Sequence, residues 1–380
     1  MHDFLLDVRG AERVFLAMCD TWPDADVYTA IYDPKGTEGR FAERTVHTSF
    51  LQRLRPNSTT FRPLLPLYPA AIESLDLSGY ELVVSSSSAW AHAVICDEGT
   101  THVCYCHNPF RYAWNARDRT LDACRTPVSR AMLRALFRRW RQWDWIAAQR
   151  VDRYLTNSRT TQARIKTYFG RESKVIYPPV ETARFAPAEV GEHYLILSEL
   201  MRHKQLDVAV RAFNRLGRPL VVVGDGPDYR RLRRLAGPSI TFAGRVSDGE
   251  AARLLASSRA LVMTGVEEFG IVAVEAQAAG RPVISVRGGG TLETVAEGVT
   301  GCFWEGGPDA LAAAVTGFDD SAVDPAACVE NAARFDVSVF REALTREVEH
   351  VLADAERPPA PHQAERRGPR RARRGLTFKP

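Results

Sequence analysis

The sequence contains no run of about 18 apolar residues, although 45% of its 380 residues are hydrophobic. This absence excludes a membrane-spanning helix as the basis of function. The N-terminal stretch also lacks the basic and then apolar order of a signal peptide. We therefore expect a cytoplasmic protein with two domains, because the chain is long and apolar enough for each to bury a core.

Cysteine is scarce and shows no repeated spacing. The seven cysteines are an odd number, which fits reduced thiols better than a disulfide framework. Cys104, Cys106 and His107 lie close together in THVCYCHNP, but no second cluster completes a set of four ligands. We expect structural cysteines and no metal or other cofactor.

Excess charge is confined to the C-terminal end. Residues 357–380 hold eight Lys or Arg and one Glu, a charge of +7 that leaves −3 on the rest of a chain whose total is +4. This Pro-rich stretch has no periodicity, so the tail 356–380 is predicted to be disordered. Its arginines have no aromatic residues between them, and we expect no binding of nucleic acid.

From His193 onward, short β-branched runs such as HYLILS and PLVVVG alternate with helical stretches. This order predicts an α/β domain with a parallel sheet covered by helices, which binds ligands beyond the carboxyl ends of its strands. The first half is less regular, yet YELVVSSS, THVCYCHNP and VDRYLTNS each predict a strand followed by a turn. The predicted units are domains 1–183 and 184–335, a helix 336–355 that crosses back to the first domain, and the tail.

The stretch EEFGIVAVE places Glu267 and Glu275 eight positions apart around the expected start of a helix at Gly270. The free amides of Gly270, Ile271 and Val272 would bind a pyrophosphate at the positive end of the helix. Glu275 lies about 7.5 Å further along the axis, within reach of a ribose. Glu267 would face a hydroxylated group beyond the phosphates. The spacing indicates a nucleotide-sugar site; the alternative is that Glu275 lies on an exposed helix surface.

The stretch EEFGIVAVEAQAAGRPVISVRGGGTLETVAEGVTG resembles the donor-site signature of the retaining glycosyltransferases of family 4. These have the GT-B fold of two facing Rossmann-like domains with a cleft between them. The resemblance extends through LVVVGDGP, FAGRVSD, NSRTTQARI and VIYPPV to CYCHNPFRYAW, over roughly residues 1 to 350. It is strongest to the bacterial branch that includes O-antigen mannosyltransferases.

The resemblance implies a role for individual residues. Glu275 would bind the ribose, Glu267 the sugar hydroxyls, and residues 270–272 the phosphates. Lys204 would stabilise the leaving diphosphate, and His107 would face the donor sugar. Two pairs of glycines would complete the donor site, one near the nucleobase and one at the sugar: Gly224 and Gly226, and Gly289 and Gly290. By contrast, we expect Asn157 and Ser158 to end a strand and cap the next helix.

Two features depart from the family pattern. The first strand is short and precedes Arg9-Gly10 where relatives have a Gly-Gly loop, so that either the true start lies upstream or the first sheet begins imperfectly. Glu199 stands where relatives carry an arginine, and a carboxylate there would repel a pyrophosphate. Arg202 lies three residues further on and could supply the missing guanidinium, with Glu199 as its anchor. The alternative is a solvated Arg202 in a slow or inactive enzyme.

The expected function is transfer of a sugar, mannose from GDP-mannose, to a glycan or polyprenyl-linked acceptor in cell-surface polysaccharide synthesis, with retention at the anomeric carbon. The alternatives are a donor-binding but inactive partner subunit and a nucleotide-sugar epimerase of the same fold.

Basic and aromatic residues share one predicted helix within SRAMLRALFRRWRQWDWIAAQRVDRYL. One interpretation is peripheral binding to the inner face of an anionic membrane. The other is a helix packed on its own sheet with its arginines in water. The residues concerned are Arg130, Arg134, Arg138, Arg139 and Arg141 with Leu133, Leu136, Phe137, Trp140 and Trp143.

Overall fold

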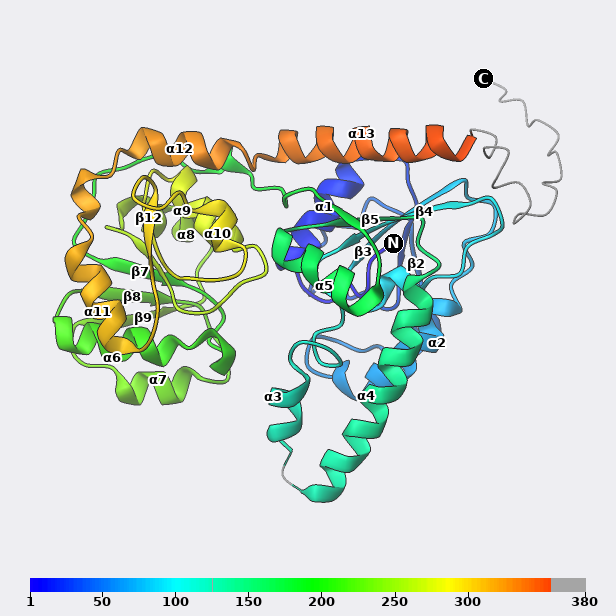
Figure 1. The fold of residues 1–380 in the computed structure, drawn as a ribbon, viewed down its shortest axis with the longest axis horizontal. Coiled ribbons are helices and arrows are strands. Elements are labelled where there is room, and N and C mark those ends of the chain that lie inside the picture. Colours follow the sequence, from blue (N-terminus) through cyan, green and yellow to red (C-terminus); the bar gives the residue numbers. More distant parts are fainter. Residues whose placement is uncertain (125, 357–380) are drawn as a thin grey trace.

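The computed structural model of this chain describes residues 1–124 and 126–356, with the backbone alone for 355 and 356. Figure 1 shows two α/β domains side by side. The first domain is built around strands β1 to β6, and the second around strands β7 to β12. Residues 357–380 of the predicted disordered tail lie outside the described residues.

The second domain contains one six-stranded sheet in the order β12-β11-β10-β7-β8-β9, with every neighbouring pair parallel. Apolar runs such as LVVV and VISV form these strands, because a parallel sheet covered on both faces needs apolar side chains on both. The order reverses between β7 and β10, which makes the carboxyl ends of these two strands the expected place for a ligand. The strands are β7 Tyr194–Leu197, β8 Leu220–Val223, β9 Ile240–Gly244, β10 Leu261–Met263, β11 Val283–Val286 and β12 Gly301–Trp304.

Helices cover this sheet as the alternating pattern predicts. Helix α6 shows why: Leu206, Ala209, Val210 and Phe213 recur every three or four residues and are buried against the sheet. The helices are α6 Leu206–Leu216, α7 Tyr229–Leu235, α8 Asp248–Ser257, α9 Ile271–Ala278, α10 Thr291–Thr294, α11 Pro308–Gly317 and α12 Pro325–Ala333, and a 3₁₀ turn, η5, spans Arg202–Lys204.

The first domain has a two-stranded and a four-stranded parallel segment, β1-β2 and β3-β4-β5-β6. His2 joins them, because it forms bridges to both Thr29 and Ser86. The predicted first strand is thus reduced to isolated bridges. The strands are β1 Val27–Thr29, β2 Val46–Thr48, β3 Leu82–Ser87, β4 Thr101–Cys106, β5 Arg153–Thr156 and β6 Ser173–Val175.

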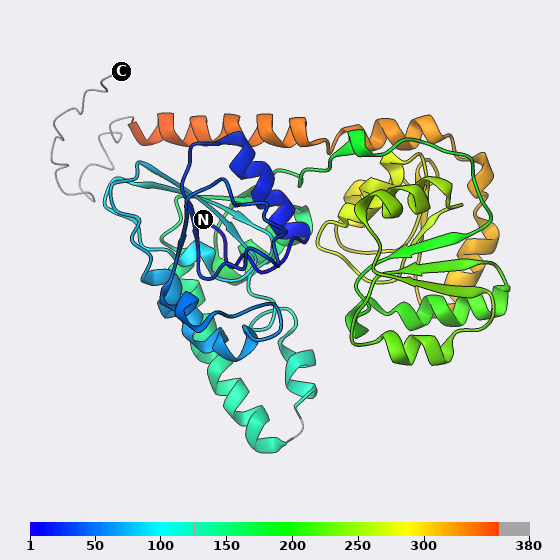
Figure 2. The ribbon, with the colours of Figure 1, turned by 180° about the vertical axis from the view of Figure 1, so that it is seen from behind.

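Two helices of the first domain, α3 and α4, project away from its sheet, as Figures 1 and 2 show from opposite sides. Thr126 caps the start of α4 by accepting a hydrogen bond from the Ser129 amide. The first-domain helices are α1 Gly10–Thr21, α2 Tyr68–Glu73, α3 Arg117–Asp122, α4 Pro127–Ala148 and α5 Arg159–Phe169, with the short 3₁₀ turn η3 at Ala91–Ala93.

Helix α13, Val337–Glu356, follows α12 of the second domain and lies across the first domain (Figure 1). Phe340, Leu344 and Val348 are buried in the apolar cluster around α1 and β4. The Glu347 carboxylate, with its side chain 1% exposed, accepts hydrogen bonds from Arg153 and Lys174 on β5 and β6. The last described helix therefore packs on the domain that the start of the chain forms.

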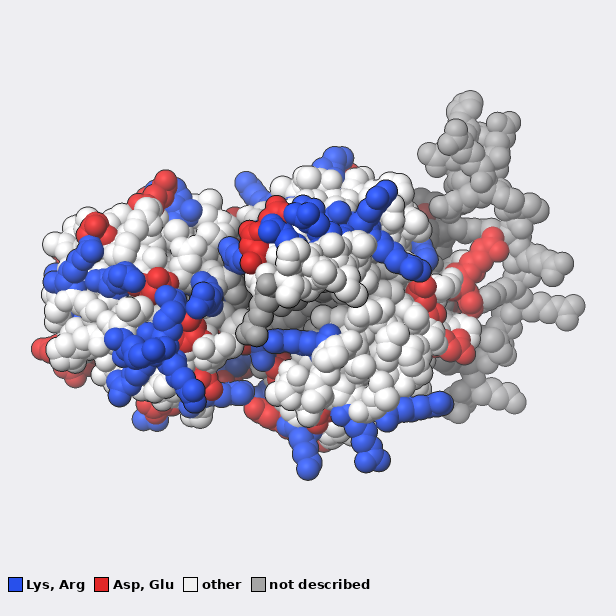
Figure 3. All heavy atoms as spheres, turned by 90° about the horizontal axis from the view of Figure 1, so that it is seen from below, with Lys and Arg blue, Asp and Glu red and all other residues white. Residues whose placement is uncertain are grey.

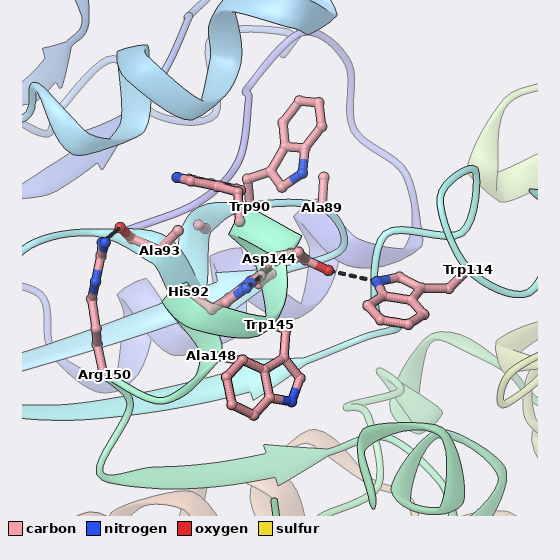
Figure 4. A network of polar contacts seen from close by, with 12 residues as sticks. Ala89, Trp90, His92, Ala93, Trp114, Asp144, Trp145, Ala148 and Arg150 are labelled. Carbon is pink, nitrogen blue, oxygen red and sulfur yellow. Dashed lines mark hydrogen bonds and ion pairs between the residues drawn. The ribbon is translucent and has the colours of Figure 1, made fainter. Parts of the chain in front are cut away.

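A buried polar network ties α4 to the first sheet (Figure 4). The Asp144 carboxylate accepts a hydrogen bond from Trp114 Nε1 at 2.6 Å and lies 3.2 Å from His92 Nε2. His92 Nδ1 in turn lies 3.2 Å from the hydroxyl of Ser87, at the end of β3. All four side chains are largely removed from water, so loss of one would leave its partners without a buried polar contact. The network therefore fixes the position of α4 relative to the ends of the strands.

Candidate active site

Two charged residues meet where the sheet order of the second domain reverses. Lys204 follows β7 and Glu267 follows β10, and the Lys204 ammonium donates a hydrogen bond to the Glu267 carboxylate. Thr264 Oγ1 fixes the backbone of Lys204 by donating to its carbonyl at 2.7 Å. Both charged side chains are about four-fifths buried, with 19% and 23% exposed. The structure thus brings together two predicted site residues that are far apart in sequence.

Helix α9 begins beside this pair. Gly270 is its N-cap, with φ of 88°, so that the helix starts one residue later than predicted. In the left-handed region a side chain would be strained. Within the described residues the amides of Ile271 and Val272 have no acceptor outside the helix. They are free to receive an anion, supported by the helix dipole.

Glu275 lies on α9 and is 8% exposed, so its alternative placement on an open surface is wrong. Burial raises the pKa of Glu275, and the nearby Arg13 and Arg184 only partly oppose this. Arg13 Nη1 lies 3.4 Å from the carboxylate, while its Nη2 donates to both oxygens of Asp248 at 3.0 Å. Arg13 comes from α1 of the first domain, so the carboxylate faces the space between the domains.

The glycines of the site pack against backbone. A Cβ at Gly289 would lie 2.1 Å from the Glu267 carbonyl oxygen, and the Gly290 amide donates to that oxygen at 2.9 Å. These residues hold the turn that carries Glu267. Gly224 and Gly226 approach the backbone of Ser198 and Leu200 in the same way. Contacts of either glycine pair with a nucleobase or sugar stay predictions.

His107 follows β4 of the first domain and is 8% exposed. Burial lowers its pKa to about 4. Its Nε2 lies 2.8 Å from the Ser86 hydroxyl, and its carbonyl accepts a hydrogen bond from Asn157 at 3.0 Å. Ser158 accepts from the Thr161 amide and caps α5, which confirms the predicted cap. His107 is therefore neutral and firmly held.

The predicted pair of Glu199 and Arg202 does not form. Glu199 instead binds Arg9 of the first domain. Arg202 lies in the turn η5 with its side chain 85% exposed, and its Nε is 4.0 Å from Asp228. The anchoring role assigned to Glu199 is wrong, because the turn directs Arg202 outward while Arg9 reaches across from the facing domain. A catalytic role for Arg202 stays a prediction.

Sequence reasoning missed a second ion cluster between the domains. Glu268 lies 3.4 Å from Arg111 and 3.2 Å from Arg164, both of the first domain. Burial alone would raise the pKa of Glu268, but the two guanidinium groups hold it below its ordinary value. Arg164 also donates to Asn108, next to His107, at 2.8 Å. The stretches CYCHNPFRYAW and NSRTTQARI contain both arginines and could have indicated them.

No group of three or more His, Cys, Asp or Glu side chains suitable for a metal ion occurs among residues 1–124 and 126–356. Burial raises the pKa of both the Cys104 and the Cys106 thiol. Both thiols belong to one buried cluster on β4, as expected of structural cysteines. In the same part of the chain, no helix is both long and apolar enough to cross a bilayer.

Three of the four aromatic residues of α4 contact the protein, whereas Trp145 is 49% exposed. Phe137 and Trp140 are buried, and Trp143 donates a hydrogen bond to Glu73 at 3.1 Å. Arg134, Arg138 and Arg139 are exposed. Figure 3, a view from below, shows Lys and Arg side chains at several separate places on that side of the molecule. This agrees with the packed-helix interpretation for Phe137, Trp140 and Trp143, but Val128 and Met132 near the start of α4 are each 69% exposed.

The two facing parallel-sheet domains, with charged loops between them, define a GT-B fold. The structure resembles sucrose-phosphate synthase from Thermosynechococcus elongatus with a TM-score of 0.71, at 17% identity, over 93% of this chain and 100% of that one. Two family models match: Glycosyltransferase Family 4 over residues 8–184 and Glycosyl transferases group 1 over residues 192–318. This chain belongs to the glycosyltransferases of family 4.

Two relatives illustrate the similarity. A GDP-mannose-dependent alpha-(1-6)-phosphatidylinositol monomannoside mannosyltransferase of Mycobacterium tuberculosis (strain H37Rv) is 34% identical over 179 residues, 38% of this chain and 46% of that protein. The match thus spans about half the length of this relative. Alpha-1,3/1,6-mannosyltransferase ALG2 of Mus musculus is 28% identical over 80% of this chain and 83% of that one. The family prediction is confirmed, and the O-antigen branch stays a prediction.

Proposed function

We propose that this chain is a retaining mannosyltransferase that moves mannose from GDP-mannose to a glycan or lipid-linked glycan. The observation that carries the proposal is the meeting of Lys204, Glu267 and the free amides of α9 at the reversal point of the second sheet. Such a place binds a nucleoside diphosphate. The names of the two relatives, both mannosyltransferases, support mannose as the sugar, and the name of the mycobacterial one supports GDP as its carrier.

In this proposal the diphosphate binds to the amides of Ile271 and Val272 and to the Lys204 ammonium. Lys204 now neutralises Glu267, so an arriving diphosphate would compete for the ammonium and release the carboxylate to the sugar hydroxyls. The fixed positive charge stabilises the leaving group as the glycosidic bond breaks. Glu275 accepts hydrogen bonds from the ribose hydroxyls.

Retention follows from attack on the same face from which the diphosphate leaves. The acceptor hydroxyl forms the new bond to the anomeric carbon, the bond to the diphosphate oxygen breaks, and a departing phosphate oxygen takes the proton. Amides and Lys204 neutralise the diphosphate, so we propose that no metal ion is needed.

Incubation of the purified chain with GDP-mannose, UDP-glucose and UDP-N-acetylglucosamine, followed by measurement of released nucleotide, tests the proposal. We expect GDP release that Lys204→Ala reduces and that exposed Lys166→Ala does not. NMR of the released sugar should show the α-anomer first. Release of UDP alone, or an inverted product, would contradict the proposal. Tight calorimetric binding of GDP-mannose without any turnover in the presence of lipid-linked mannosides would indicate the inactive partner subunit.

We also propose that the start of α4 contacts an anionic membrane surface at the cytoplasmic face, where a lipid-linked acceptor would lie. Two exposed apolar side chains, Val128 and Met132, precede exposed Arg134, Arg138 and Arg139 on α4, the helix that projects from the first domain in Figure 1. Apolar insertion together with basic side chains is what interfacial binding requires.

Sedimentation with vesicles of phosphatidylglycerol and phosphatidylcholine tests this contact. The double variant V128S/M132S should reduce the bound fraction several-fold, whereas Val299→Ser, which removes a comparably exposed side chain from the second domain, should not. Equal binding of all three proteins, or no binding at low salt, would contradict the proposed contact.

A further inference from the structure

A row of four buried polar side chains leads from α1 to His107. Glu12 Oε1 lies 3.5 Å from His2 Nε2, and His2 Nδ1 lies 3.0 Å from the hydroxyl of Ser86. The same hydroxyl lies 2.8 Å from His107 Nε2. None of the four residues is more than 8% exposed. Because the contacts within the row are buried, the hydrogen in each contact must come from one of the two groups that meet there.

The surroundings of Glu12, the residue at the outer end of the row, favour its ionised form. Burial alone would raise the pKa of Glu12, but its hydrogen bonds with His2 and with the Arg9 amide hold it below its ordinary value. Its second oxygen accepts from the Arg9 amide at 3.0 Å. An ionised carboxylate only accepts hydrogen bonds, so the His2 nitrogen that faces it, Nε2, carries a hydrogen.

The remaining hydrogens then follow in order. A His2 ring with one hydrogen, on Nε2, leaves Nδ1 as an acceptor for the single hydrogen of the Ser86 hydroxyl. The Ser86 oxygen is left as an acceptor toward His107, whose Nε2 must supply the hydrogen. His107 is itself neutral, so its Nδ1 holds a lone pair. Within the described residues Nδ1 has no hydrogen-bond partner.

The rings in this row are held in place by their neighbours. Phe15 of α1 stacks on His2 with ring centroids 4.9 Å apart, and Tyr105 of β4 meets His107 edge-on at 5.1 Å. Asp3, the other charged group near His107, is occupied by the backbone amides of residues 88–91. These contacts fix the planes of the two rings.

We propose that Glu12, His2 and Ser86 are positioning residues, which hold His107 as the tautomer with hydrogen on Nε2 and present its Nδ1 to the cleft as an acceptor. This rests on the proposed function, in which His107 meets the donor sugar. An acceptor nitrogen receives a hydrogen bond from a sugar hydroxyl, whereas an N–H group in its place would need a sugar oxygen lone pair. The row therefore decides which group of the sugar His107 recognises.

NMR of the full chain with ¹⁵N-labelled histidine tests the tautomer directly, with His107 assigned by the loss of its signals in His107→Gln. We expect the wild-type His107 Nδ1 to resonate as an unprotonated nitrogen. Ser86→Ala should give both tautomers. Ser85→Ala is the matched control, because Ser85 is equally buried on the same strand and contacts His102, not His107, at 2.8 Å. It should leave the His107 signals unchanged.

Kinetics give a second measurement. Ser86→Ala and Glu12→Gln should each lower kcat about tenfold while KM for the sugar donor changes less than about threefold, and Ser85→Ala should leave kcat unchanged. A protonated Nδ1 in wild-type His107, or an unchanged tautomer in Ser86→Ala, would overturn the inference. The NMR result holds or fails even if the chain transfers a sugar other than mannose, so the two proposals fail separately.

Discussion

The two domains are built on the same parallel-sheet plan but bury different chemistry. The second domain places strands such as LVVV in an apolar core and carries the charged residues of its candidate site on loops and on α9. The first domain buries four histidines, His2, His92, His102 and His107, each in contact with a serine hydroxyl of β3 or with a carboxylate.

In the second domain, different residues therefore provide the stability of the fold and the chemistry of the site. In the first domain, the same buried residues contribute to both. A loop residue of the second domain can change without disturbing the apolar strands beneath it. In the first domain, the groups that orient His107 and α4 also satisfy the buried polar atoms of the core. Substitutions in the first domain should therefore affect folding most, and substitutions at the site of the second should affect the reaction most.

The largest expected effect is on the stability of the first domain. Asp144→Ala leaves His92 and the Trp114 indole without their buried partner, and should lower the free energy of unfolding by about 3 to 5 kcal/mol. Urea unfolding measures this. Asp118→Ala, which removes an exposed carboxylate of the same domain, should change stability by less than about 0.5 kcal/mol. An equal loss of stability in the two variants would contradict the proposed role of the buried network.

Lys204→Ala tests the opposite behaviour in the second domain. Loss of the ammonium should lower kcat about a hundredfold, equivalent to about 2.7 kcal/mol of transition-state stabilisation. The midpoint of urea unfolding should shift less than in Asp144→Ala, because the Glu267 side chain is 23% exposed and keeps contact with water when Lys204 is lost, whereas Asp144 and His92 are each 1% exposed. A folded variant with full turnover would show that Lys204 does not take part in the reaction.

Glu275→Gln should weaken donor binding by about 1.5 to 3 kcal/mol, because a charge-assisted bond to the ribose is lost. Burial raises the pKa of Glu275 in the folded state. The ionised form therefore opposes folding at neutral pH, and the variant should be no less stable there than the wild type. Calorimetry over a pH series should show wild-type affinity falling as pH drops through the raised pKa, with a flat profile for the variant.

The smallest expected effect concerns the pair between the domains. Arg9 and Glu199 are 58% and 48% exposed, so their ion pair adds little stability. Arg9→Ala should nevertheless weaken donor binding about threefold, because Glu199 then repels the diphosphate without a counter-charge. The double variant R9A/E199A should recover the affinity. No recovery would show that Glu199 is too distant to act on the donor.

Local pattern predicted most of the second domain. Alternating β-branched runs and helical stretches indicated a parallel sheet with helices on its faces, and EEFGIVAVE placed a helix start within one residue of Gly270. The first domain was harder, because YELVVSSS and THVCYCHNP bury serine, histidine and cysteine on strands, where apolar periodicity gives little signal. The resemblance of several motifs in order indicated the GT-B fold for both domains.

Spacing within short stretches of the sequence determined the elements. The resemblance of the sequence to family 4 indicated the fold and predicted the residues that a donor would meet. Only the tertiary structure decided which charges face each other across the domains. Arg9 rather than Arg202 meets Glu199, and Arg111 and Arg164 meet Glu268. The same holds for the row from Glu12 to His107, whose members come from α1, the first residues, β3 and β4. Such pairings depend on which strand ends and helix starts the fold brings together. A pattern within a short stretch of sequence does not contain that information.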